Sequence, residues 1–149
     1  MSVKATQRNV TNNQSTVDFV RENIFTFGNR YQTATFINDS GAEADFSAGS
    51  LVLRDTTTAG QIKPAVAGAT LVDVIGILAI YGTSTLADDA TIDNASYCIK
   101  GDIDASLLQL PSGVTLDTVP TGATKNLRDI LTDLGFVLNN VTENSKTAN

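Results

Sequence analysis

The clearest pattern in the chain is helical and lies near its C-terminal end. Large apolar residues recur there at i, i+3, i+4 and i+7 and so share one helix face: Leu127, Ile130, Leu131 and Leu134. Thr124 is a suitable cap for the first turn, and Gly135 is the residue type that commonly follows a last turn. The pattern predicts an amphipathic helix over about residues 124–134, with all four apolar side chains in the core, followed by a short closing strand at 136–138.

Shorter runs before this helix alternate apolar and polar residues or are apolar throughout, which is typical of strands. Three such runs are Arg30–Ile37, Ser50–Arg54 and Tyr97–Lys100. The most apolar run, Leu71–Tyr81, contains Gly76, which indicates a bulge or a close approach between two backbones. Together these runs predict a β-rich domain.

Turn residues separate the predicted strands and interrupt one of them. Pro64 lies within the run Gln61–Val66 and restricts it to an edge or irregular strand, because proline has no backbone N–H to donate. A long polar loop is predicted over residues 82–94, and a turn at Gly101. Since no internal repeat of useful period is present, the chain is expected to form one domain of the α+β, β-rich class.

Six of the nine aromatic residues lie between positions 17 and 46. Aromatic side chains are prominent in both cores and interfaces. We expect Phe36 and Phe46 in the core, and Phe19 and Phe25 as contact residues. The latter two follow a polar stretch without periodicity that ends near Thr16, and such a stretch is expected to be disordered in an isolated chain.

Composition agrees with the strand pattern and narrows the choice of partners. Thr, Ser, Asn and Gly together supply 53 of the 149 residues, which favours strands and turns over helices. The net charge of -6 argues against nucleic acid, whose phosphates require a basic surface. Residues 1–30 carry an excess of two basic side chains, whereas residues 64–149 carry an excess of six acidic ones. This split charge suggests an electrostatically steered contact.

The side chains needed for most catalytic or metal sites are scarce. There is no histidine, and Cys98 is the single cysteine, so a histidine base, an intramolecular disulfide and a zinc site made of several thiolates are excluded. Asp88, Asp89 and Asp93 form one acidic group, and Asp102 with Asp104 another; we interpret them as solvated loop carboxylates, because their spacing lacks the calcium-loop pattern. We therefore expect no enzyme activity, no metal and no cofactor. With no apolar leader and no apolar run long enough to span a bilayer, a soluble protein is expected.

Four segments, in order along the chain, resemble a known family. They are Leu51–Leu53 followed by a Thr-rich loop, Gly76–Ala79 with the sequence GILA, Ala95–Ile103, and Leu127–Leu138 with the sequence LRDILTDLGFVL. In this order they resemble the head decoration (cement) proteins of tailed bacteriophages, the family typified by the lambda head decoration protein D. The similarity covers about residues 48–138.

The resemblance implies a compact β-tulip fold with little regular structure and a structural function. Such a protein would bind the outer surface of an expanded capsid as a homotrimer and clamp neighbouring major capsid subunits. The implied partners are the major capsid protein and further copies of this chain, with no nucleic acid and no membrane. The implied location is the virion surface, after synthesis in the cytoplasm of the bacterial host.

The same resemblance divides the chain into three parts. Residues 1–23 would form an extended capsid-binding arm, residues 24–138 the decoration domain, and residues 139–149 a polar C-terminal tail. Capsid contacts are expected from apolar residues in and next to the arm: Val10, Val17, Phe19, Val20, Ile24 and Phe25. Two other classes remain open on composition, namely a carbohydrate-binding or fibre-attachment module and a structural component of the phage tail or neck.

Overall fold

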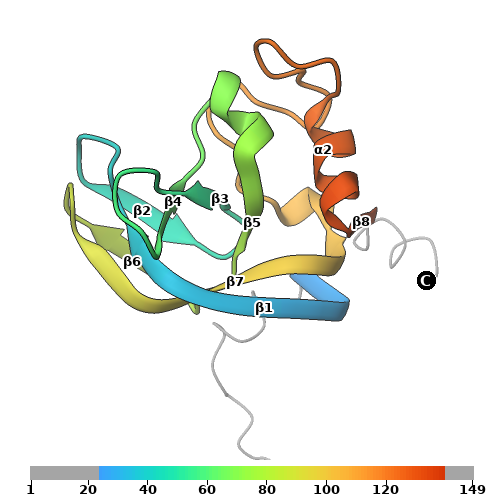
Figure 1. The fold of residues 1–149 in the computed structure, drawn as a ribbon. Helices are drawn as coiled ribbons and strands as arrows, with labels where there is room; N and C mark the ends of the chain where they lie inside the picture. The colour runs from blue at the N-terminus through green and yellow to red at the C-terminus, as the bar shows by residue number, and fades with distance from the viewer. Residues whose placement is uncertain (1–23, 140–149) are drawn as a thin grey trace, which may run out of the picture.

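The computed structural model describes residues 24–139. Within this range strands dominate, and a single α-helix lies near the C-terminal end (Figure 1). The elements are β1 (Phe25–Ile37), β2 (Ala44–Ser47), β3 (Leu51–Arg54), β4 (Gln61–Pro64), the 3₁₀-helix η2 (Ala69–Asp73), β5 (Val74–Leu78), β6 (Thr83–Leu86), β7 (Thr91–Asp104), the 3₁₀-helix η3 (Ala105–Leu107), α2 (Leu127–Leu134) and β8 (Phe136–Asn139).

Five strands close into a small barrel in the order β1-β4-β3-β5-β7, because β7 pairs back onto β1. The β1–β4 pair is parallel and the other pairs around the barrel are antiparallel. β8 adds to β7 in parallel beyond the end of β5, and β2 with β6 forms a separate two-stranded sheet. Figure 1 shows the long strands β1 and β7 running along each other.

Two apolar clusters lie on opposite faces of the barrel wall. One receives side chains from all five barrel strands, among them Phe36, Val52, Ile62, Leu78 and Tyr97, and fills the interior. The other lies outside β3, β5 and β7 and is covered by α2, η2 and β8. Phe36 and Phe46 meet edge to face at 4.9 Å between ring centres, which confirms both as core residues.

The helix forms where the pattern predicts it, but it is shorter and only part of its apolar face is buried. It begins at Leu127, and its cap is Asn126 rather than Thr124. Gly135 ends it in the left-handed conformation, as expected. Leu127 and Leu131 are fully buried, which confirms them as core residues. Ile130 is only half-buried and Leu134 is 36% exposed, so the prediction that all four residues belong to the core is wrong.

Three other expectations need correction. The predicted loop 82–94 contains β6 and the start of β7. The predicted turn at Gly101 is instead a point where β7 continues with a φ of 127°. β4 is not an edge strand, since it pairs with both β1 and β3. Pro64 is tolerated there because it is the last residue of the strand, where a missing N–H interrupts no further pairing.

Asn38 is a fully buried polar residue that joins two turns. Its Nδ2 donates to the carbonyl oxygens of Ala42 (2.9 Å) and Leu86 (2.9 Å), and lies 3.2 Å from that of Ala87. Its Oδ1 accepts from the backbone N–H and the hydroxyl of Ser40. A buried amide is stable only when its groups are paired in this way, so Asn38 fixes the β1–β2 turn against the end of β6.

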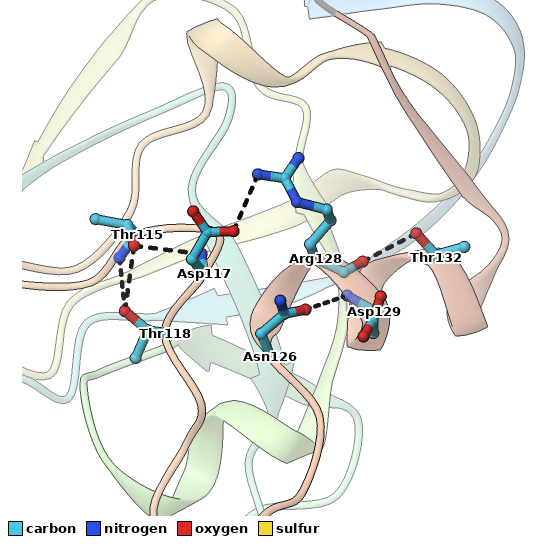
Figure 2. A network of polar contacts seen from close by, with 7 residues as sticks. All are labelled: Thr115, Asp117, Thr118, Asn126, Arg128, Asp129 and Thr132. Carbon is cyan, nitrogen blue, oxygen red and sulfur yellow. Dashed lines mark hydrogen bonds and ion pairs between the residues drawn. The ribbon is translucent and has the colours of Figure 1, made fainter.

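The loop before α2 supplies acceptors to the first turn of the helix (Figure 2). Asn126 Oδ1 accepts from the backbone N–H of Asp129 at 3.0 Å. The N–H groups of Leu127 and Arg128 donate to the carbonyl oxygens of Thr118 and Leu116, each at 2.9 Å. Arg128 also forms an exposed ion pair with Asp117 at 3.3 Å. The loop and the helix are therefore one hydrogen-bonded unit.

Replacing Asn126 by alanine is expected to lower the free energy of unfolding by about 1 kcal/mol, because the N–H of Asp129 loses its acceptor. Urea denaturation would measure this change. The matched control is Asn126→Asp, which keeps an acceptor oxygen and should stay within about 0.5 kcal/mol of the wild type. Equal losses in both variants would contradict a capping function for Asn126.

Candidate interaction surface

The residues expected to contact a capsid fall into two groups. Val10, Val17, Phe19 and Val20 lie outside the described residues. Ile24 and Phe25 are buried, with 2% and 7% of their surface exposed. Both belong to the outer core cluster, and the Phe25 ring meets Tyr31 edge to face at 5.8 Å. Because their side chains already pack in the core, the prediction that Ile24 and Phe25 anchor a partner is wrong.

Phe27, two residues further on, is 76% exposed and is the most exposed large apolar residue that the structure describes. It lies opposite Asp102 of β7, and Asp102 lies opposite Val137 of β8, which is 51% exposed. This row across three strands places an aromatic and an aliphatic side chain on either side of one carboxylate. Exposed apolar side chains of this size are typical of contact sites.

A pair of bulges turns Phe27 outward. Between Phe25 and Phe27, two steps along β1 match one step along β7, and a second register shift follows between Phe27 and Arg30. Gly28 adopts a φ of 67°, which suits glycine. The sequence contains one signal for this, the Gly28-Asn29 pair directly after the aromatic residue.

Specific contacts fix this bulged segment to β7. Asn29 Nδ2 and Thr26 Oγ1 both donate to the carbonyl oxygen of Asp102, at 3.0 and 3.1 Å. A Cβ atom on Gly101 would lie 2.7 Å from the Asn29 Cα, so the close approach of the two strands requires glycine at position 101. These hydrogen bonds and the close approach at Gly101 hold the segment that carries Phe27 in its outward orientation.

Two cations that form no ion pair with any residue of the described range 24–139 lie near Phe27 in the β1–β7 register. Arg30 and Lys100 are opposite each other in the β1–β7 register, and both are exposed. The ion pairs within residues 24–139 are Lys63–Asp39, Lys125–Asp133 and Arg128–Asp117; Arg30, Lys100 and Arg54 take part in none of them. Like charges directly opposite on neighbouring strands are unfavourable. We refer to Phe27, Arg30, Lys100, Asp102 and Val137 as the Phe27 surface.

A groove of about 580 Å³ lies elsewhere, between β2, β3, the end of β4 and the segment 109–112. Its walls are mostly apolar and include Ala44, Phe46, Leu51, Pro64, Val66 and Leu110. Asp45 is the one charged residue that lines it, and its Oδ1 accepts a hydrogen bond from Thr85 Oγ1 at 2.6 Å. Val66 at its wall is 54% exposed. We refer to this hollow as the Val66 groove.

Three other ionisable or sulfur groups, Lys125, Asp104 and Cys98, have structural contacts. The hydrogen bond and charge of Asp133, 2.7 Å from Lys125 Nζ, raise the pKa of Lys125 on the open surface. Asp104 is buried, not solvated as expected, and its Oδ1 accepts from the N–H and hydroxyl of Ser106 at 3.0 and 2.6 Å. Cys98 is buried, as expected. Within residues 24–139, His, Cys, Asp and Glu form no group of three that could hold a metal ion.

Searches of protein-family models, of curated proteins and of solved structures find no match to this chain. No helix in the described part of the chain has the length and apolar character needed to cross a membrane.

Proposed function

We propose that this protein is a structural component of a phage virion. It binds the outer surface of the expanded capsid as a homotrimer and stabilises the shell by clamping neighbouring major capsid subunits. It acts by binding, without catalysis and without a cofactor. Its finer fold is of the β-tulip type, in which a small barrel carries a helix on one side.

The observation that carries this proposal is the convergence of the four segments that resemble decoration proteins. Leu51 lies opposite Ile77, Ile77 lies opposite Cys98, and Gly101 lies opposite Phe136. Leu127 and Leu131 of α2 complete the same outer core cluster. Segments far apart in the sequence therefore form one continuous packed unit. Such a unit is expected where the four motifs together specify one family fold.

The surface of the domain also favours binding to another protein. The Phe27 surface combines an exposed aromatic residue with two cations that take part in none of the ion pairs of residues 24–139, and aromatic and arginine side chains are enriched at interface hot spots. It lies on β1, close to Ile24, where residues 1–23 join the domain. An arm that pairs with a capsid loop through its main chain would need few particular side chains.

Deleting residues 1–23 tests the proposal. The deletion ends just before the buried residues Ile24 and Phe25, so we expect the unfolding midpoint and the oligomeric state to stay nearly unchanged. Binding to expanded, undecorated capsids should weaken at least about tenfold, because the main-chain contacts of the arm with the capsid would be lost. Co-sedimentation of the full chain and the truncated chain with capsids is the measurement.

Each outcome of this experiment contradicts or favours a specific function. Equal binding by both forms would contradict a binding function for the arm. Loss of folding on truncation would assign residues 1–23 to the core. No binding by the full chain, together with affinity for immobilised glycans, would favour a carbohydrate-binding module. Rings that form without capsids and do not bind them would favour a tail or neck component.

A further inference from the structure

The Phe27 surface and the Val66 groove are complementary in shape and in charge. The surface presents a protruding aromatic ring with one carboxylate, Asp102, and two cations, Arg30 and Lys100, which take part in no ion pair within residues 24–139, so cations outnumber carboxylates. The groove is an apolar hollow whose one charged lining residue is the carboxylate Asp45. Its volume of about 580 Å³ is ample for an aromatic side chain. β1, β7 and β8 form the surface, whereas β2, β3, β4 and the segment 109–112 form the groove.

We propose that the Phe27 surface of one copy docks into the Val66 groove of a second copy. The Phe27 ring enters the hollow beside Val66, and Arg30 approaches Asp45. Because the two contact sites are different patches, the contact is head to tail, and a pair of copies keeps one free surface and one free groove. Repetition of the contact gives a ring where the rotation between copies closes and an open filament where it does not. A ring of three rests on the proposed function, whereas the contact itself does not.

Charge favours this arrangement over a symmetric one. Pairing two Phe27 surfaces would bring four cations together, Arg30 and Lys100 of both copies, against only two carboxylates, Asp102 of both copies. Docking into the groove instead places a carboxylate near the two like charges, which are unfavourable opposite each other in the isolated domain. Like-charge contacts suppress the wrong pairing, and complementary ones fix the right one.

Single substitutions in the full chain test the contact by analytical ultracentrifugation. Phe27→Ala removes the protruding ring, and Val66→Arg places a long cation at the wall of the groove. Both positions are exposed, so the fold should be retained, and urea denaturation checks this. Each variant is expected to raise the dissociation constant at least about tenfold. The matched control is Val119→Arg at a comparably exposed valine outside both patches, and it should leave the constant within about twofold.

Mixing the two variants gives the sharper result. Phe27→Ala keeps an intact groove and Val66→Arg keeps an intact surface, so an equimolar mixture should form heterodimers through one wild-type contact. A symmetric contact between like patches would give no such recovery.

Exchanging the charges of Arg30 and Asp45 is a second test of the contact. Arg30→Asp should weaken association about fivefold or more, and Asp45→Arg in the same chain should restore part of it. Arg54→Asp, at the other unpaired cation, should have no effect.

Three results would overturn the contact: a wild-type chain that stays monomeric at about 1 mM, association that neither variant weakens, or a mixture that forms no heterodimer. Co-sedimentation with expanded capsids distinguishes a failure of the proposed contact from a failure of the proposed function. Wild-type binding to capsids without the expected variant effects would overturn the contact alone. Recovery in the mixture without any capsid binding would overturn the proposed function alone.

Discussion

Replacing Leu131 by alanine is expected to lower the free energy of unfolding by about 2–5 kcal/mol. Leu131 is fully buried and belongs to the cluster between α2 and the outer faces of β3, β5 and β7. Truncation removes apolar burial and leaves a cavity that neighbouring strands can fill only in part, because each barrel strand is paired with a neighbour on both sides. Urea denaturation with a two-state fit would measure the loss.

Leu134→Ala is the matched control for this prediction. It makes the same chemical change three residues further along the same helix, where the side chain is 36% exposed. We expect a loss below about 1 kcal/mol. Equal losses at both positions would contradict the burial of Leu131 and the exposure of Leu134 in this helix.

Gly76→Ala is expected to lower the free energy of unfolding by about 3 kcal/mol. A Cβ atom at this position would lie 2.4 Å from the carbonyl oxygen of Cys98 and 3.0 Å from the Tyr97 ring. The obstacle is the backbone of β7, which pairs with β1 on its other edge and cannot move away alone. Alanine would otherwise suit a strand better than glycine, so a loss of this size reports the close approach itself.

Gly60→Ala separates this steric effect from backbone conformation. Gly60 has a φ of 82°, and nothing lies within 4 Å of a Cβ built on it. Alanine there should cost about 1–2 kcal/mol through conformation alone. If thermal and urea denaturation both show Gly76→Ala to be no more harmful than Gly60→Ala, the two strands are not in contact at Gly76.

The local periodicity of apolar residues predicted the structure correctly where the position of a side chain is determined by residues close to it in the sequence. The run Leu51–Leu53 forms a strand, the centre of the run Leu71–Tyr81 forms β5 after the 3₁₀-helix η2, and Leu127 and Leu131 are buried on one helix face. Gly76 combines both properties expected of it. It lies in a register shift between β3 and β5, and its Cα approaches the β7 backbone.

Periodicity failed where a bulge changes which face a side chain occupies. In a regular strand Phe25 and Phe27 would share a face, because side chains repeat every two residues. The extra residue between them in β1 instead sends Phe25 into the core and Phe27 to solvent. A pattern of alternating apolar and polar residues does not show where such an extra residue is inserted. The exposed anchor of the candidate surface is therefore Phe27, a residue for which the sequence alone predicted no specific function.

The pairing of strands that are far apart in the sequence also could not be predicted from the local pattern of residues. The parallel β1–β4 pair and the antiparallel β1–β7 pair depend on closure of the whole barrel. The local sequence around Pro64 therefore predicted an edge or irregular strand, whereas β4 has a neighbouring strand on both sides. Asn38 is a similar case. Its acceptors on Ala42 and Leu86 come from two turns that only the complete fold brings together.

The β1–β7 closure also determines when this protein can fold during its synthesis. Arg30 pairs with Lys100, which the ribosome adds 70 residues later. At about 5–20 residues per second, β1 waits roughly 4–14 s for this partner. During that time its apolar residues and free backbone groups are exposed to other nascent chains. Barrel closure therefore cannot precede the synthesis of β7, and contacts so distant in sequence place the domain among slow-folding topologies.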